Sequence, residues 1–509
     1  MSKQVVSVWI VGDQLLAVHP AIAAAEREAG KEQVRIVLVE SRQRTRRLPY
    51  HQKKQVLIFS AMRHYAANLR AQGYQVDLIR AGSAVAGLKE HVAARRPGRL
   101  FTMAASAYGG RQWQQHHLAP EISVSITIIP NQQFLLGLYN PYPDPEPERR
   151  YTQEYFYRKM RRHFDVLMEG EDPAGGEWNY DKQNREPLPA EVALPEPLTF
   201  APDDLTRQVM QEVRSAGHGM GSVTGFNLAV THEQAQAALD DFVENRLPLF
   251  GPYEDAMTGR SRTLFHSVLS PYVNLGLITP RQMIDAAVAA YDRGHAPINS
   301  VEGFVRQVLG WREFMYWQYW RQMPELLLAN DWAADRPVPT FMWTGDTDMY
   351  CLQKTLNGIL ESGYAHHIER LMLLSNFFML AGIDPAEVND WFLSGFIDAY
   401  DWVMAPNVLG MGLNADGGLT ATKPYIASAN YINKMSDYCG DCHFQHTHRT
   451  GDDACPFNFL YWNFLLLHEE KLRANPRLGR NVLGLRYLDD AERRRVREQA
   501  AQFLDRLAD

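Results

Sequence analysis

Short apolar runs recur along the first 130 residues, and segments with a helical pattern separate most of them. The runs cover residues 5–12, 33–40, 74–81, 100–105 and 122–130. Residues 55–71 place apolar side chains three or four positions apart, as one face of an amphipathic helix does. Apolar strands that alternate with such helices predict an open, mostly parallel sheet covered on both faces. We therefore expect an α/β domain over residues 1–137.

The pattern changes at about residue 138. Residues 140–148 place a proline at every second position, and proline interrupts both helices and strands because it lacks a backbone N–H and fixes φ. We expect an interdomain linker over residues 138–205. From Asp204 onward the pattern is helical, with few of the alternations typical of strands. A large all-α domain over residues 206–509 is therefore the second part of the predicted fold.

Composition narrows the class of protein. The chain has 509 residues, of which 46% are hydrophobic, so it can form two or three domains with a large core. It contains no apolar run long enough to span a bilayer, and it opens on a strand-like segment, which favours a cytoplasmic protein without a membrane contact. The net charge of −7 argues against a general polyanion binder but leaves room for a local basic groove. We expect a monomer.

Four cysteines form the densest candidate site. They are Cys351, Cys439, Cys442 and Cys455. One Cys-x-x-Cys pair within a set of four thiolates suits either an iron–sulfur cluster or a tetrahedral zinc ion. Three histidines follow in the same loop, so spacing alone leaves zinc open. Two disulfides fit less well, because no secretory segment opens the chain.

A second candidate site lies at the end of the first strand. The residues there, from Gly12 to Leu15, do not form the glycine-rich dinucleotide fingerprint. In open parallel sheets a ligand binds at the carboxyl ends of the strands, which here means near Asp13, Gln14 and Glu40. The alternative is that these side chains only cap helices and turns.

Three segments of the helical half resemble the photolyase and cryptochrome family of flavoproteins. They are residues 265–279, 306–314 and 364–402, and their order and spacing match the family. The four cysteines, the loop at residues 177–185 and a pair of adjacent histidines are similar to the iron–sulfur bacterial cryptochromes and photolyases, also called prokaryotic (6-4) photolyases. The resemblance covers nearly the whole chain.

This resemblance implies a function and a set of cofactors. It implies FAD in the helical domain, a [4Fe-4S] cluster on the four cysteines, and a 6,7-dimethyl-8-ribityllumazine antenna near Asp13, Gln14 and Glu40. The implied reaction is light-driven repair of (6-4) pyrimidine-pyrimidone photoproducts in UV-damaged DNA, by electron transfer from reduced FAD. A blue-light photoreceptor of the cryptochrome type, with little or no repair activity, is the alternative. Repair of cyclobutane dimers is a third.

The resemblance also assigns roles to single residues. The implied FAD contacts are Ser267, Val268, Leu269, Ser270, Gln307, Trp311, Arg312, Arg370, Asp398, Asp401 and Asn407. Small hydroxyls and free backbone N–H groups suit the pyrophosphate at the first four of these, although an ordinary helix cap has the same composition. Arg370 and Asp398 resemble an ion pair beside the isoalloxazine ring. Met404 stands where a polar side chain is usual in the family. The identity of the residue that faces flavin N5 is therefore left open by the resemblance.

Catalysis is expected at His366 and His367. Reversal of a (6-4) adduct needs a proton at the leaving heteroatom, and histidine, with an unperturbed pKa of ~6.5, can deliver one. The resemblance aligns His367 with the histidine that faces the pocket and leaves His366 as support, with Met411 also in the pocket. For electron transfer we expect Trp391 and Trp343, with Tyr431 as a bridge; a packed aromatic core is the alternative. Arg185 is the candidate DNA contact.

Overall fold

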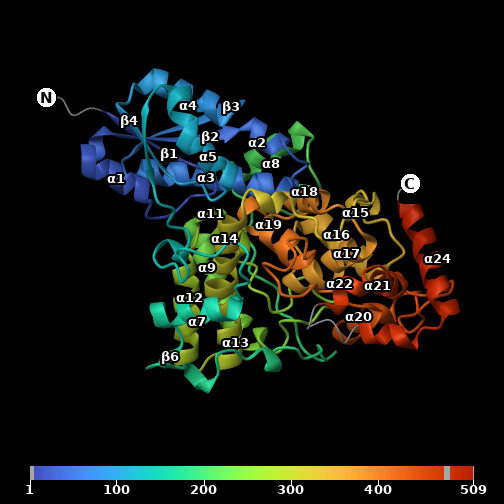
Figure 1. Ribbon diagram of the computed structural model, residues 1–509. Coiled ribbons are helices and arrows are strands. Elements are labelled where there is room, and N and C mark those ends of the chain that lie inside the picture. Colours follow the sequence, from blue (N-terminus) through green and yellow to red (C-terminus); the bar gives the residue numbers. More distant parts are fainter. Residues whose placement is uncertain (1–4, 475–481, 508–509) are drawn as a thin grey trace.

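A five-stranded parallel sheet forms the N-terminal part of the computed structural model, which describes residues 5–474 and 482–507 (Figure 1). Its strands are β1 (Val6–Ile10), β2 (Val34–Ser41), β3 (Gln75–Ala81), β4 (Arg99–Met103) and β5 (Ser125–Ile129). They are ordered β3-β2-β1-β4-β5, and every neighbouring pair is parallel. Each strand overlaps one of the predicted apolar runs, so the predicted parallel sheet is confirmed.

Helices bury both faces of this sheet. The covering helices are α1 (Pro20–Ala29), α3 (Gln52–Ala71), α4 (Ala84–Arg95), α5 (Tyr108–His116) and α6 (Leu118–Ile122), with the short η1 (Lys31–Gln33) and α2 (Arg42–Arg46) between them. On β1, Val8 faces the core that contains α1 and α3, whereas Trp9 faces a second core with Leu88 of α4 and Leu118 of α6. The alternation of side chains along a strand places neighbouring residues on opposite faces.

The segment after the sheet crosses the molecule before it enters the helical body. It contains η2 (Leu135–Gly137), α7 (Gln153–Phe164), the ribbon of β6 (Met168–Glu169) and β7 (Asp172–Pro173), η3 (Ala174–Gly176), η4 (Asp181–Gln183) and α8 (Asp204–Ala216). Helix α7 packs on the helical body, whereas α8 returns to pack against α3 of the α/β part. The residue limits of the domains stay a prediction.

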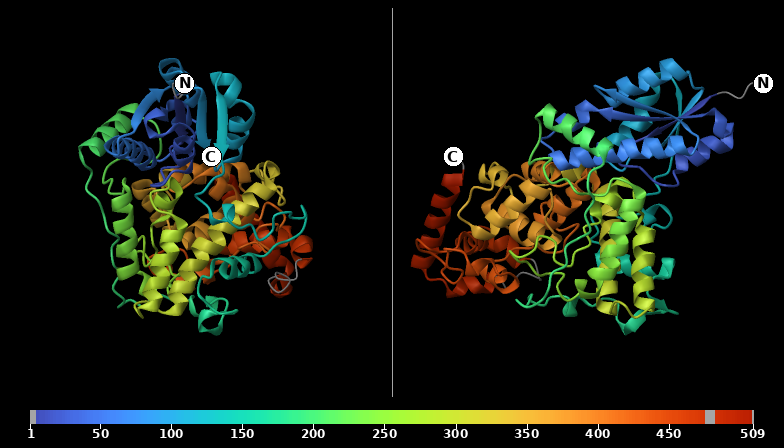
Figure 2. Two further views of the ribbon diagram at one scale, coloured as in Figure 1. Left: turned by 90° about the vertical axis from the view of Figure 1, so that its left-hand side faces the viewer. Right: turned by 180° about the vertical axis from the view of Figure 1, so that it is seen from behind.

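The rest of the described chain is helical, as Figures 1 and 2 show. Its helices are α9 (His232–Asn245), α10 (Leu247–Phe250), α11 (Ser270–Leu275), α12 (Pro280–Asp292), α13 (Ile298–Val305), α14 (Glu313–Gln322), η6 (Glu325–Leu328), α15 (Phe341–Thr344), α16 (Tyr350–Ser362), α17 (Asn376–Ala381), α18 (Pro385–Gly395), α19 (Asp401–Ala405), α20 (Ala429–Met435), η9 (Tyr438–Gly440), α21 (Pro456–Leu467), α22 (Glu469–Arg473), η10 (Leu483–Tyr487) and α24 (Asp490–Leu507). Among the described residues, no helix is long and apolar enough to cross a membrane.

Wide π-helical turns interrupt this body at three places in the described chain: η5 (Arg306–Arg312), η7 (Glu369–Ser375) and η8 (Pro406–Gly412). Each is continuous with an α-helix, because η5 leads into α14, η7 leads into α17 and η8 follows α19. Such turns change the direction of the side chains that follow and occur often at functional sites. The space between these three segments is therefore a candidate functional site.

Candidate functional site

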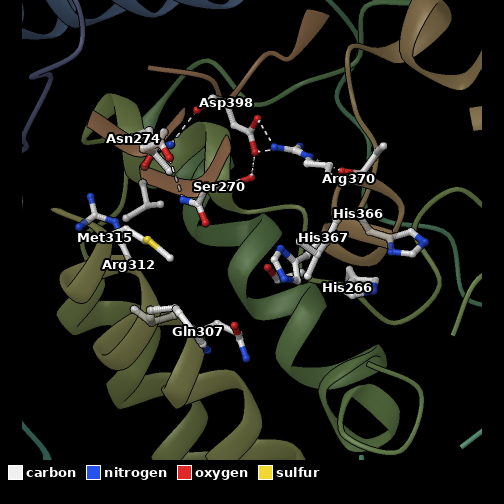
Figure 3. A pocket seen from close by; sticks show the side chains of 18 of the residues that line it. His266, Ser270, Asn274, Gln307, Arg312, Met315, His366, His367, Arg370 and Asp398 are labelled. Atoms are coloured by element: carbon white, nitrogen blue, oxygen red, sulfur yellow. Dashed lines mark hydrogen bonds and ion pairs between the residues drawn. The ribbon is translucent and has the colours of Figure 1, made fainter. Parts of the chain in front are cut away.

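A pocket of about 290 Å³ lies in the helical body, and all three π-helical segments line it (Figure 3). Its volume is at the lower end of the range usual for ligand pockets. The structure brings most of the sequence-predicted residues to this pocket, namely Ser267, Val268, Ser270, Gln307, Trp311, Arg312, His366, His367, Arg370, Asp398, Asn407 and Met411. Met404 lines it as well. Residues that lie more than a hundred positions apart in the sequence therefore line one cavity.

Two predicted cofactor residues lie outside this pocket. Leu269 is fully buried in the core and does not line it. Asp401 lines a different cavity and forms an ion pair with Arg47, with 3.5 Å between Oδ1 and Nη2. Sequence spacing could not separate these two from their neighbours, because one position along a helical turn rotates the direction of a side chain by about 100°.

The Arg370–Asp398 ion pair forms one wall of the pocket. Arg370 donates two hydrogen bonds to the Asp398 carboxylate, at 3.0 and 3.1 Å, and a third from Nε to the Ala365 carbonyl at 2.7 Å. Ser270 Oγ donates to the same carboxylate at 2.6 Å, and Asn274 Nδ2 donates to the Asp398 carbonyl at 2.9 Å. Figure 3 shows these groups gathered around Asp398. The pair thus joins α11, η7 and the loop before α19.

The turn that leads into α11 is strained. Val268 has a φ of 57°, in the left-handed region that branched side chains rarely adopt. Backbone strain of this kind persists only where the surrounding structure imposes it, and it is common at ligand sites. Val268, Ser267 and Ser270 all line the pocket. The turn therefore presents a constrained backbone and two hydroxyls to a ligand.

Arg312 adds unpaired donors beside the pocket. Its Nη1 donates to Glu313 at 3.0 Å, and its guanidinium lies 4.2 Å from the ring centre of Phe134 and 5.0 Å from that of Trp402. In the described structure, Nε and Nη2 of this buried side chain have no hydrogen-bond partner. A buried donor without a partner costs free energy. These two N–H groups therefore suit an acceptor on a bound ligand.

The two histidines of the predicted catalytic pair differ in environment. His367 is open to solvent through the pocket, whereas His366 is 1% exposed. The ring of His366 stacks on His266, with 4.6 Å between centroids and 13° between planes, as Figure 3 shows. Burial, together with the charges of His367 and Arg370, lowers the pKa of His366 to about 3. Burial, followed by the charge of Arg370, also lowers the pKa of His367, to about 4.

Glu369 is a pocket neighbour that the sequence analysis missed. Its Oε2 lies 3.5 Å from His366 Nε2 and accepts the His366 backbone N–H at 3.3 Å, whereas its Oε1 accepts the Tyr438 hydroxyl at 2.9 Å. Burial raises the pKa of Glu369 to about 7. Its position three residues after His366 is the signal that could have found it.

Glu254 is a second acid missed by the sequence analysis. It lines the pocket and accepts a hydrogen bond from Gln307 Nε2 at 2.6 Å. Burial raises the pKa of Glu254 to about 8, although Arg306 opposes the shift. No motif includes this residue, which reaches the pocket from a turn after α10, ahead of the first segment that carries predicted FAD contacts.

A second pocket, of about 320 Å³, opens where the α/β part meets the helical body. Of the three predicted antenna residues, only Asp13 lines it. Gln14 is fully buried and donates to the Ala104 carbonyl at 2.9 Å, and Glu40 pairs with Arg63 at 2.7 Å. Both therefore have structural partners instead of an open position.

Lys54 is the chemically distinctive residue of this second pocket. Its Nζ donates to the carbonyls of Leu393 and Ala399, at 3.1 and 2.6 Å, and lies 4.8 Å from the ring centre of Tyr50. Burial lowers the pKa of Lys54 to about 7. Trp402 lines this pocket and also the first one, so one aromatic side chain separates the two cavities.

The four cysteines line a common small cavity. Cys351 lies in the first turn of α16, Cys439 lies in η9, Cys442 follows in the next loop, and Cys455 directly precedes α21. Burial raises the pKa of Cys439 to about 11 and that of Cys455 to about 12, with contributions from the neighbouring thiols. Among the described residues, no group of three or more His, Cys, Asp or Glu side chains is placed to hold one metal ion.

The predicted electron-transfer residues lie in and near the aromatic core. Trp391 is fully buried, donates its indole N–H to the Met342 carbonyl at 3.0 Å, and contacts Phe392, which lines the main pocket. Trp343, the neighbour of Met342 in α15, is half-buried, as is Tyr431 in α20. Trp391 is thus one aromatic ring away from the pocket.

The candidate DNA contact lies at the surface. Arg185 has a side chain that is 62% exposed, and it pairs with Asp181 at 2.7 Å and Asp255 at 3.7 Å. An exposed arginine held by two carboxylates is oriented but remains accessible to a phosphate.

Comparisons with known proteins agree on one family. A family model described as deoxyribodipyrimidine photo-lyase-related protein matches residues 8–228. A protein of Agrobacterium fabrum (strain C58 / ATCC 33970) named (6-4) photolyase is 41% identical over 507 residues, which cover 98% of this chain and 99% of that protein. A crystal structure of a bacterial class III photolyase from Agrobacterium tumefaciens is similar in fold, with a TM-score of 0.57, 17% identity, and coverage of 99% of this chain and 98% of that one. The cryptochrome of Synechocystis sp. PCC6803 has a TM-score of 0.60 at 12% identity, with 99% of both chains covered.

The Arg370–Asp398 pair yields a test of stability. Asp398→Asn removes one charge and leaves Arg370 without its ionic partner in a largely buried position, so we expect the free energy of unfolding to fall by about 3 kcal/mol. Urea unfolding of the flavin-free protein measures this. Asp285→Asn, in the exposed pair with Arg281 at 2.8 Å, is the matched control and should change the free energy of unfolding by less than about 0.5 kcal/mol. Equal effects at the two sites would contradict the structural role of the buried pair.

Proposed function

The chain belongs to the photolyase and cryptochrome family, and we propose that it is a (6-4) photolyase, an enzyme that uses light to repair (6-4) pyrimidine-pyrimidone photoproducts in DNA. The observation that carries this proposal is the position of His367, which opens into the same pocket as the Arg370–Asp398 pair. A proton donor beside a flavin site is what reversal of a (6-4) adduct requires and what splitting of a cyclobutane dimer does not. The 41% identity to a named (6-4) photolyase supports the same activity.

The main pocket fits FAD. The strained turn at Val268 with its flanking serines suits the pyrophosphate, the free N–H groups of Arg312 suit an acceptor, and Arg370 with Asp398 suits the polar edge of a ring system. When bound and reduced, FAD supplies the electron that light drives into the lesion. The protein side chains hold the cofactor, exclude water and place His367 at the open side of the cavity.

His367 is the proposed general acid. The lesion must be flipped out of the duplex to enter the pocket, and His367 is the histidine of the pair that solvent reaches. Its imidazole can place a proton on the heteroatom that leaves one base for the other. Buried His366 supports it from behind.

Three arginines of the linker are the proposed DNA contacts. Helix α7 carries Arg158 and Arg162, whose guanidinium groups lie 5.2 and 4.6 Å from the ring centre of Trp178. Arg185 lies on the same linker. Phosphate contacts depend on such local positive charge and not on the negative net charge of the chain.

We infer that the second pocket holds the antenna, with 6,7-dimethyl-8-ribityllumazine as the candidate. Asp13 and Lys54 offer an acceptor and an amino group to a polar heterocycle, and Tyr50 and Tyr400 offer aromatic surface. Absorption and fluorescence of the purified protein identify the chromophore. A protein that carries only flavin would contradict this assignment.

The cysteine cavity is the proposed site of a [4Fe-4S] cluster. All four thiols line one cavity, yet the described residues offer no set that closes on a single ion. A cluster takes one thiolate at each of four irons and so holds its sulfur ligands farther apart than a zinc ion does, at ~2.3 Å per Zn–S bond. This arrangement favours the cluster over zinc. A positive metal centre would also stabilise thiolates whose protonated form burial otherwise favours.

Metal analysis tests the cluster. Anaerobically purified protein should contain about four iron atoms and about four acid-labile sulfide ions per protein molecule, as the cluster formula requires. Cys442→Ser should lower both and reduce the yield of folded protein, because ligation contributes to the free energy of folding. Stoichiometric zinc without iron would disprove the assignment.

Photoreduction tests Trp391. Electrons from a thiol donor reach excited flavin through closely spaced aromatic rings, so Trp391→Phe should bind FAD normally but photoreduce at least about tenfold more slowly, as followed by flavin absorption under blue light. Trp113→Phe, the same change in the α/β part, is the control and should photoreduce at the wild-type rate. Wild-type photoreduction in Trp391→Phe would point to another route.

Repair tests His367 and the function as a whole. Reduced protein is illuminated with DNA that carries either a (6-4) photoproduct or a cyclobutane dimer, and the products are followed by chromatography. We expect repair of the (6-4) lesion, and we expect His367→Ala to bind FAD and damaged DNA but to lose a factor of about 10² to 10⁴ in repair. His295→Ala, on the surface beside Glu244, is the control. No (6-4) repair by the wild type would favour the photoreceptor alternative.

A further inference from the structure

Glu369 lies behind the catalytic pocket in contact with a histidine that lines it. The carboxyl is 6% exposed, and its Oε2 is 3.5 Å from Nε2 of His366. Tyr438 and Thr355 donate hydrogen bonds to the other oxygen, at 2.9 and 3.5 Å. In the described structure neither ring nitrogen of His366 has a hydrogen-bond partner, so Glu369 Oε2 approaches Nε2 at 3.5 Å without a formed hydrogen bond. The carboxyl oxygen that faces this imidazole nitrogen is Oε2, which also accepts the His366 backbone N–H.

We infer that Glu369 is a positioning residue for (6-4) repair, which holds a proton next to His366 Nε2 and supplies it to the histidine pair; this inference rests on the proposed function. The contact fixes where that proton can reside. Tyr438 and Thr355 occupy Oε1 as donors, and the His366 backbone N–H reaches Oε2 from its own side. A proton on the carboxyl therefore belongs on Oε2, which faces the imidazole.

The charges around this contact favour a proton on the acid and not on the histidines. His366 is faced by His266, His367 and Arg370, so a further positive charge on its ring is costly. Glu369 is faced by Tyr438 from η9, Thr355 from α16 and Arg370 from its own segment. Burial raises the pKa of Glu369 to about 7 and lowers that of His366 to about 3. Near neutral pH the resting proton is therefore on Glu369.

The transfer balances without any further reactant. The Oε2–H bond of Glu369 breaks as an N–H bond forms at His366 Nε2, the N–H bond at His366 Nδ1 breaks as an N–H bond forms on the free ring nitrogen of His367, and His367 gives the proton of its other ring nitrogen to the leaving heteroatom. The carboxylate that remains is stabilised by the Tyr438 and Thr355 hydroxyls and by the His366 backbone N–H. Because the lesion and the repaired bases are isomers, the proton returns by the reverse route.

The test is the pH dependence of repair by reduced, FAD-loaded protein on DNA with a (6-4) photoproduct. A carboxyl with a raised pKa loses its proton as pH rises through that pKa, so wild-type yield should fall as pH rises through about 7. Glu369→Gln keeps the shape, and its amide oxygen can still accept from Tyr438 and Thr355, but it has no acidic proton to release. We expect its yield to be at least about tenfold lower at pH 7, without the alkaline decline, while FAD binding and DNA binding persist. Glu369→Asp should restore part of the yield together with the decline.

Two further variants separate this role from others. Glu361→Gln, the same change at an exposed glutamate paired with Arg262, should behave as the wild type. Glu254→Gln tests the other buried acid of the pocket. Its repair yield at low pH can differ from that of the wild type, but the yield should still fall as pH rises through about 7. Wild-type repair by Glu369→Gln, or a lower yield with an unchanged pH profile, would overturn the proton role. If the wild type repairs no (6-4) lesion at any pH, the proposed function itself fails, which is a distinct result.

Discussion

The Arg370–Asp398 ion pair is the contact on which the geometry of the site depends. Arg370 lies in the η7 turn, Asp398 lies in the loop before α19, and Ser270 and Asn274 of α11 hold Asp398 from the other side. These segments are separated by about a hundred residues or lie on different helices, so no local interaction could set their spacing. A bidentate contact between two planar groups fixes orientation as well as distance. Without it the pocket would lose one wall.

The backbone of the π-helical segments allows the close packing that supports this wall of the pocket. The π-helical segments η5 and η8 contain glycines at points of close approach: a Cβ on Gly412 would lie 2.6 Å from Ser375 Oγ, and one on Gly310 would lie 2.3 Å from Gln153 Nε2. Such contacts exclude any larger residue unless the neighbour moves. The first brings η8 against η7 at the pocket, and the second lets α7 of the linker dock on η5. Small residues and wide turns therefore act together to place side chains that an ordinary α-helix would turn elsewhere.

The sequence predicts the parts of this structure that depend on local pattern. Apolar runs located every strand of the parallel sheet, and motifs located the pocket residues on η5, η7 and η8. The sequence did not predict the contacts between distant segments. Glu40 was expected at a ligand because it ends a strand, but Arg63 of α3 pairs with it. Asp401 was expected beside the flavin, but the turn directs it to Arg47. Glu369 went unnoticed because its partner Tyr438 lies 69 residues away.

The two pockets are coupled through a shared wall. Trp402 is 2% exposed and lines both cavities, and the guanidinium of Arg312 lies over its ring. Phe134, from the end of the α/β part, packs edge-on against the same indole at 4.7 Å and stacks on Tyr316 of the helical body at 3.5 Å. A close-packed stack of this kind cannot shift on one side alone. The position of the first pocket is therefore fixed relative to the second by the packing that joins the α/β part to the helical body, which makes this interface a wall of both cavities and not only a link between domains.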